Sequence, residues 1–249
     1  MRKLMIVTAA MLGIGLCQSP AAAANGTDPA VAITARANVG LSSEKGNTDT
    51  DKINLDADLA ARTAHQRYNI GGEFNRELAD DQETADNWIA YGNARHYFSS
   101  VWYGYGSAMY EHDAFSDLDL RQTYGAGAGY QFFESKNLNL SASAGLAQIY
   151  TDYTTSPDDD FPSVQWEVNY DQFLLDRAFQ LFHRQTGYVG IEESNRWALK
   201  TRQGVRLPIY KGLTATLQYN YDYNNAPSPN AKEKWDSKIM FLLGYAFGE

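Results

Sequence analysis

Apolar and polar side chains alternate along most of this chain with a period of two residues. The clearest case is the stretch TDKINLDADLA, residues 50–60. Every second side chain there is apolar: Ile53, Leu55, Ala57 and Leu59. The side chains between them are polar or charged: Lys52, Asn54, Asp56 and Asp58. This period predicts a β-strand with one apolar face and one polar face.

The same period recurs and predicts twelve strands, with no segment that reads as a helix. The predicted strands cover residues 30–42, 51–61, 67–76, 88–98, 101–111, 120–132, 138–149, 163–173, 180–189, 196–207, 213–223 and 235–247. The alternation is too weak to fix which way the fourth, fifth and ninth strands face. An even number of antiparallel strands can close into a barrel whose two ends lie on the same side.

The connections between these strands alternate in length. Those after even-numbered strands are short, such as ESKN at 134–137. Those after odd-numbered strands are more polar and mostly longer, such as LADDQETADN at 78–87 and TDYTTSPDDDFP at 151–162. Outer-membrane barrels have short periplasmic turns and longer extracellular loops. We therefore expect an all-β fold, a closed antiparallel transmembrane β-barrel of about twelve strands.

Aromatic residues gather near the ends of the predicted strands, where a membrane-spanning strand would meet the membrane–water interface. We expect two aromatic girdles there, to which Tyr97 and Tyr188 also belong. Their main members are Trp88, Trp102, Trp166, Trp197, Trp235, Tyr245 and Phe247. A soluble periplasmic β-protein with ordinary core aromatics is the alternative, because any half-buried sheet alternates.

The first 24 residues have the features of a secretory signal peptide, which leaves residues 25–249 for the barrel domain. Arg2 and Lys3 are followed by an apolar run at 4–16 and by the small residues AAAA at 21–24. Cleavage after this run would remove Cys17, the only cysteine, so the mature chain would form no disulfide. Lipidation of Cys17 is the weaker alternative. The expected location is the outer membrane.

The mature chain would be strongly acidic. The formal net charge is −9, and it becomes −11 without residues 1–24, which contain two bases and no acid. This charge argues against a nucleic-acid partner. The expected partners are outer-membrane lipid, lipopolysaccharide and, during biogenesis, the barrel-assembly machinery. We expect a monomer.

In such a barrel the polar face of each strand lines the interior. The charged residues predicted there are Lys52, Asp56, Asp58, Glu73, Glu167, Asp171, Lys200, Arg202, Arg206 and Lys238. We expect Asp56 and Asp58 to pair with a base such as Arg202 or Arg206. Two interpretations stay open: an ion-pair network that fills the bore, or a path for a small solute. Small barrels are filled by side chains and barrels of 16–18 strands are open, and twelve lies between.

Few residues point to catalysis, and we expect neither an enzyme nor a cofactor. No histidine stands in a metal-binding spacing, and the chain has no nucleophile elbow or P-loop. The alternative is an outer-membrane hydrolase that uses His183 with Ser141 or Ser143 on the barrel wall. Asp158, Asp159 and Asp160 are weak candidates for a Ca²⁺ or Mg²⁺ site, and a solvated acidic loop is the favoured interpretation.

Four motifs resemble one protein family. SSEKGNTDT at 42–50 resembles the Ser/Gly-Asn-Thr-Asp/Glu signature of the YdiY-like, salt-induced outer-membrane proteins, the domain of unknown function 481. VWYGYGSAMYE at 101–111, YGAGAGYQF at 124–132 and IMFLLGYAF at 239–247 match in the same order. The resemblance covers roughly residues 30–249. It implies an outer-membrane barrel with no established activity and no catalytic residues.

One departure from other outer-membrane barrels lies at the end of the chain. Many of them finish on an aromatic residue that the assembly machinery reads, whereas here Gly248 and Glu249 follow Phe247. We expect a structural or envelope-related role, in a salt or osmotic response as the name of the family implies. The alternatives are a narrow channel for small solutes or ions, an outer-membrane hydrolase and a soluble periplasmic β-protein.

Overall fold

The computed structural model describes residues 31–44, 50–227 and 233–248 of the 249-residue chain. The predicted signal peptide, Cys17 and most of the GNTDT motif lie outside the described residues. The described residues form twelve strands: β1 (Ala32–Glu44), β2 (Thr50–Arg62), β3 (Gln66–Ala79), β4 (Gln82–Tyr97), β5 (Trp102–Asp113), β6 (Leu118–Glu134), β7 (Leu138–Tyr153), β8 (Asp159–Leu174), β9 (Phe179–Gly190), β10 (Trp197–Tyr210), β11 (Leu213–Asn224) and β12 (Trp235–Phe247). These residues contain no helix long and apolar enough to cross a membrane.

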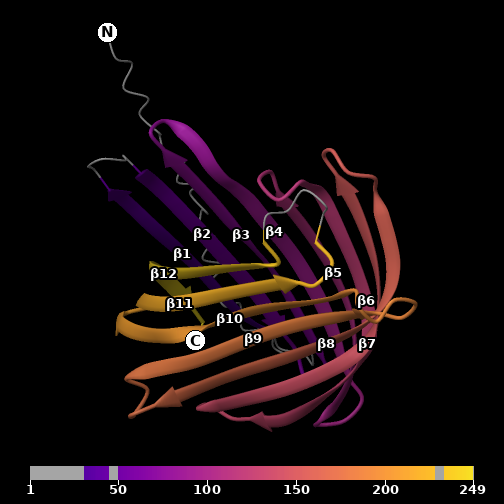
Figure 1. Ribbon diagram of the computed structural model, residues 1–249. Coiled ribbons are helices and arrows are strands. Elements are labelled where there is room, and N and C mark those ends of the chain that lie inside the picture. Colours follow the sequence, from indigo (N-terminus) through magenta and orange to yellow (C-terminus); the bar gives the residue numbers. More distant parts are fainter. Residues whose placement is uncertain (1–30, 45–49, 228–232, 249) are drawn as a thin grey trace. The chain divides into compact units, whose positions relative to one another are not determined.

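All twelve strands pair antiparallel with their neighbours in the chain and close into one barrel (Figure 1). Closure is made by β1 and β12, whose register runs from Ala35 opposite Phe247 to Val39 opposite Leu243. The start of β1 and the end of β12 therefore lie at the same rim. We call this the terminal rim, and it also carries the turns at 63–65, 98–101, 135–137, 175–178 and 211–212. The opposite end of the barrel is called the loop rim.

Side chains alternate between the outside and the inside of this wall as the sequence predicts. On β12, Phe241 is 65% exposed, whereas its neighbours Met240 and Leu242 are 7% and 0% exposed. On β2, Leu55 and Leu59 are both 42% exposed, and the carboxylates between them line the interior. A one-residue shift of register would reverse every one of these side chains, so the apolar exterior fixes the register.

The barrel has an apolar outside and a mainly polar inside. Polar side chains such as Gln165 and Thr216 are almost completely buried, whereas Ile239 and Leu41 stand exposed on the outer face. A protein dissolved in water places its large apolar side chains inside, so this distribution does not suit the soluble alternative. It suits a wall surrounded by hydrocarbon, in which only a closed sheet can pair all its backbone groups.

Two predicted loops are shorter than the sequence suggests. The segment at 78–87 continues the β3–β4 hairpin, and its turn is Asp80–Asp81, with φ of 50° and 62°. Of the predicted loop at 151–162, only residues 154–158 stay outside β7 and β8. Beyond the apolar band both faces of a strand meet water, so alternation disappears while backbone pairing continues. Hydrophobic pattern alone therefore places these strand ends too early.

The seven predicted girdle residues all take outward positions in the alternation of their strands. Trp102 and Trp235 are 54% and 49% exposed, and Trp102 meets Tyr130 edge to face at 4.9 Å between ring centroids. Trp197 stacks on Tyr223 at 4.5 Å. Trp166 lies over Gly187, where any side chain would collide with the indole ring.

Tyr97 and Tyr188 are exceptions to the girdle prediction, because both turn inward and are only 5% exposed. Tyr97 contacts Tyr103 at 5.0 Å between ring centroids. The strands that carry these two residues are among those whose facing the sequence left open. A position at the end of a strand says nothing about the face, which is why the prediction was wrong for both.

Candidate functional site

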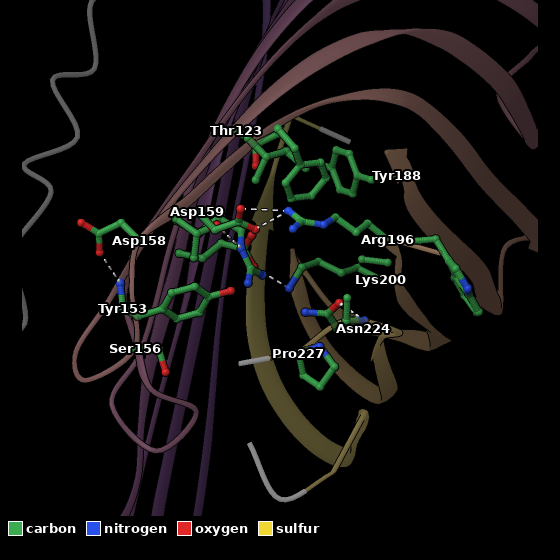
Figure 2. Close-up of a pocket in the computed structure, with 18 of the residues that line it drawn as sticks. Thr123, Tyr153, Ser156, Asp158, Asp159, Tyr188, Arg196, Lys200, Asn224 and Pro227 are labelled. Atoms are coloured by element: carbon green, nitrogen blue, oxygen red, sulfur yellow. Dashed lines mark hydrogen bonds and ion pairs between the residues drawn. The ribbon is translucent and has the colours of Figure 1, made fainter. Parts of the chain in front are cut away.

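Two cavities lie in the interior of the barrel. The larger has a volume of about 1170 Å³ and reaches the terminal rim, where Lys136, Arg177 and Gly248 line it. The smaller, of about 370 Å³, lies toward the loop rim and is drawn in Figure 2. Both cavities are bounded by Thr123, Tyr188 and Lys200. The two cavities therefore adjoin at the level of these residues.

A cluster of charged side chains crosses the bore near this level, and we call it the septum. It consists of Glu73, Glu111, Lys200, Arg202 and Asp222. Lys200 Nζ lies 2.5 Å from Glu111 Oε1 and 3.5 Å from Asp222 Oδ2. Arg202 donates from Nε to Glu73 Oε1 at 3.0 Å and from Nη1 to Asp222 Oδ1 at 2.5 Å. Two bases thus hold three carboxylates.

The septum crosses the bore from one wall to the opposite wall. Arg202 projects from β10, and Glu73 is on β3, five strands away in a barrel of twelve. Lys200 projects from the same strand to Glu111 on β5, five strands away in the other direction. The side chains are largely shielded, with Glu111 only 4% exposed. A charged side chain that is shielded from water is stable only beside a partner of opposite charge. Loss of one side chain of the septum would therefore destabilise its partners.

The larger cavity is rich in bases although the whole chain is acidic. Ten of the 21 lysines and arginines line it, against six of the 30 acids. The bases are Arg36, Arg62, Arg67, Arg95, Lys136, Arg177, Arg184, Lys200, Arg202 and Arg206. The acids are Asp56, Asp58, Glu73, Glu134, Glu167 and Asp171.

Most acids of the cavity are held by these bases. Glu134 binds two arginines, Arg62 at 2.5 Å and Arg67 at 2.6 Å. Arg184 lies 2.8 Å from Asp171. Arg95 lies 3.7 Å from Glu167 on the far wall. The two remaining acids accept neutral donors: Asp56 accepts from Asn38 at 2.6 Å, and Asp58 accepts from Tyr91.

Arg206 is a buried base of this cavity. It is 5% exposed, donates from Nη1 to Gln180 Oε1 at 2.6 Å and lies over the ring of Phe182 at 4.9 Å. Its buried Nε has no hydrogen-bond partner, and no ion pair joins Arg206 to another of the described residues. The positive charges of Arg36 and Arg184 oppose that of Arg206, and the carboxylates of Asp171 and Asp56 partly offset them.

The structure places all ten predicted interior residues on inward positions, with different partners from those expected. Asp56 and Asp58 pair with neither Arg202 nor Arg206, so that prediction was wrong. The tilt of the strands brings Arg202 opposite Glu73 instead. Outside the large cavity, Lys52 lies 3.4 Å from Glu77, and Lys238 donates to Asn54 at 3.3 Å.

Sequence reasoning missed several residues of this interior. Glu111 was missed because the facing of its strand is ambiguous, and Asp222 was missed although its strand alternates clearly. Arg95 and Arg184 also lie on strands whose facing is ambiguous, and Arg36 lies on the first strand, for which no facing is predicted. The alternation of Asp222 with Tyr221 and Tyr223 was the available signal.

The hydrolase hypothesis fails on geometry. His183 faces outward, where its ring nitrogens lie 2.9 Å from Gln203 Oε1 and 3.4 Å from Gln185 Oε1. Ser141 and Ser143 are buried on the inner face of β7, 1% and 8% exposed. The barrel wall separates the imidazole from both hydroxyl groups, so neither serine can transfer a proton to His183.

The acidic stretch at the loop rim is engaged by a base. Asp159 binds Arg196 through both oxygens at 2.9 and 2.7 Å, as Figure 2 shows, and Asp158 accepts from the backbone N–H of Tyr153 at 3.2 Å. Hydrogen bonds from Arg196 to Asp159 and Glu193 raise the pKa of the guanidinium. Within the described residues no group of three potential ligands gathers for a metal ion.

Solved structures of outer-membrane barrels share this fold. The NanC porin is 11% identical, with a TM-score of 0.50 over 87% of this chain and 99% of that chain. The translocator domain of the autotransporter NalP from Neisseria meningitidis is 13% identical, with a TM-score of 0.46 over 90% of each chain. At such identities the likeness concerns the fold alone. No curated protein shows a significant sequence match.

The sequence pattern of one family, described as protein of unknown function, DUF481, matches residues 37–247. The match runs from the middle of β1 to the last residue of β12 and so includes every strand of the barrel. It also agrees with the resemblance of the GNTDT motif and the three aromatic and glycine-rich segments. The chain belongs to the DUF481 family.

Proposed function

We propose that this protein is an outer-membrane barrel that passes small hydrophilic solutes through a bore closed by the septum. One observation carries the proposal: two cavities of the interior share Thr123, Tyr188 and Lys200 in their linings, and the ion pair of Lys200 with Glu111 crosses the bore at this level. A barrel with only a structural role has no need of a large cavity below this level. Side chains can rearrange without any change in the backbone of the wall.

The orientation of the barrel follows from its turns and its exterior. Outer-membrane barrels have their short turns on the periplasmic side. The terminal rim would therefore face the periplasm, and the loop rim would face outward. The apolar outer face and its outward-pointing tryptophans support a position in the outer membrane, reached by export with a cleaved signal peptide.

Opening the septum requires at least one ion pair to break in a shielded place. Loss of one partner of a buried pair costs about 3–5 kcal/mol. Because 1.4 kcal/mol corresponds to a factor of ten, a cost of about 3 kcal/mol keeps the open state below about one per cent. The expected behaviour of the wild type is therefore rare, brief opening.

Conductance across a planar lipid bilayer tests the proposal. The decisive variant is Lys200→Ala with Arg202→Ala, because it removes both side chains that cross the bore. The matched control is Lys52→Ala with Arg76→Ala, which removes two bases outside the septum. We expect frequent conductance steps from the septum variant and rare conductance steps from the wild type and the control. The wild type and both variants must first migrate as folded barrels on SDS gels run without heating the sample.

Absence of steps from a correctly folded septum variant would contradict the channel and leave the second candidate, a closed structural barrel. The observation that favours this candidate is that every charge of the septum has a partner of opposite sign.

We further infer an envelope role without catalysis, in keeping with the salt-related name of the family that the sequence resembles. The outward position of His183, away from both serines, supports the absence of the proposed hydrolase. Growth of a deletion strain in high salt tests the envelope role. Normal growth and normal envelope permeability of that strain would contradict it.

A further inference from the structure

Fixed charge is distributed unevenly along the axis of the barrel. The described turns of the loop rim contain seven acids and two bases. The acids are Asp80, Asp81, Asp117, Asp158, Glu192, Glu193 and Glu233, and the bases are Arg196 and Lys234. The turns of the terminal rim contain Lys136, Arg177 and Lys211 against Asp176 alone. One end is thus acidic, and the other end and the large cavity are basic.

Positive charge in the large cavity is in excess at two separate places. At the terminal rim, Arg62 and Arg67 share one carboxylate, that of Glu134. Deeper in the bore, Arg206 has no ion pair and lies near Arg184, whose charge is already matched by Asp171. Each place can receive one more negative group without displacing an existing pair.

The acids of the same cavity leave no position for a cationic ligand. Glu134, Asp171, Glu167 and Glu73 each bind at least one arginine. Asp56 and Asp58 already accept hydrogen bonds from Asn38 and Tyr91. At the first four of these carboxylates a cation would have to displace a guanidinium group.

We propose that the large cavity binds an elongated organic anion with at least two carboxylate or phosphate groups, which it receives from the terminal rim. Arginine suits this task because its planar fork of donors matches both groups. One anionic group would lie at Arg62 and Arg67, and the second at Arg206 and Arg184. The cavity, of about 1170 Å³, has room for a ligand that spans both places.

The acidic loop rim gives the proposal a direction. An anion that approaches from that side meets repulsive charge and then the septum, whereas from the terminal rim it meets an excess of bases over acids. Passage of the anion through the bore rests on the proposed channel function. Binding of the anion does not, because the cavity reaches the terminal rim while the septum is closed.

Calorimetry on the full-length barrel in detergent micelles tests the binding with tripolyphosphate, a linear polyanion, and with citrate. Sucrose and spermidine serve as the neutral and cationic probes. We expect Arg206→Gln to weaken binding of both anions by about ten- to one-hundred-fold, since a hydrogen bond to a charged group contributes about 1.5–3 kcal/mol. Arg184→Gln is the second variant, in case the first does not fold.

Arg76→Gln is the matched control, because Arg76 pairs with Glu83 on the outer face and should not affect binding. Equal affinity of the wild type and both cavity variants, or stronger binding of spermidine than of the anions, would overturn the inference. Conductance without anion binding would overturn this inference and keep the channel. Anion binding without conductance would keep this inference and overturn the channel.

Discussion

The ion pair between Arg202 and Glu73 gives the strictest test of the septum. Arg202 Nε lies 3.0 and 3.1 Å from the two oxygens of Glu73, and the side chains are 16% and 18% exposed. Replacing Arg202 by Met leaves a shielded carboxylate on the opposite wall without its partner. Asp222 is affected less, because Lys200 stays 3.5 Å away.

The expected loss of unfolding free energy for Arg202→Met is about 3–5 kcal/mol. Glu73→Met should cost a similar amount, since it leaves Arg202 with Asp222 alone. The double variant should be far more stable than the sum of the two losses predicts, because two apolar side chains then face each other. We expect a coupling energy of at least about 1.5 kcal/mol between the two positions.

Denaturant titration of the refolded barrel in lipid vesicles, followed by tryptophan fluorescence, measures this coupling. The exposed pair Arg76 and Glu83 serves as the control, with side chains 50% and 36% exposed. Its coupling should be about 0.2–1 kcal/mol, as for other surface pairs. If the loss of unfolding free energy in the double variant equals the sum of the two single losses within about 0.5 kcal/mol, a contact between Arg202 and Glu73 across the bore is refuted.

Three further predictions address the wall, a turn and the N-terminus. Leu55→Arg should lower the unfolding free energy in lipid by about 2–4 kcal/mol, whereas Leu55→Ile should change it little; equal stability of the two would contradict a lipid-facing wall. Asp81→Val should lower the unfolding free energy by about 1–2 kcal/mol, because Asp81 has a φ of 62°, and Asp81→Gly should not lower it. A glycine variant less stable than the valine variant in the same titration would rule out the two-residue turn. N-terminal sequencing of the exported protein should begin at Asn25, and an intact Met1 would disprove the signal-peptide prediction.

The sequence predicts the two faces of the barrel wall well, because the side of a strand to which a side chain points is a local property. Neighbours such as Leu55 and Asp56 must point to opposite sides of a strand, and each type of side chain suits only one side. Where small residues interrupt the alternation, as around Tyr97, the sequence contains no such signal. Polar extensions such as the hairpin at Asp80 and Asp81 are hidden because both of their faces meet water, so no alternation marks them.

The partners of interior residues could not be predicted because they depend on the whole barrel. Arg202 and Glu73 are 129 positions apart in the chain. Their meeting depends on the tilt of the strands and on the stagger accumulated over several registers, which together fix the width of the bore. No single segment specifies these quantities, so Asp56 appeared as good a partner for Arg202 as Glu73.

A single strand supplies both the closure of the bore and the unbalanced charge below it. Lys200, Arg202 and Arg206 all occupy inward positions on β10, so all three point into the same lumen. At about 3.3 Å per residue, Arg206 lies about 13 Å along the strand from Arg202. This distance exceeds the reach of a guanidinium group, so the acids that neutralise the two upper bases cannot also neutralise the third. The spacing of three bases in the sequence therefore places the ion pairs of the septum above a base-rich cavity.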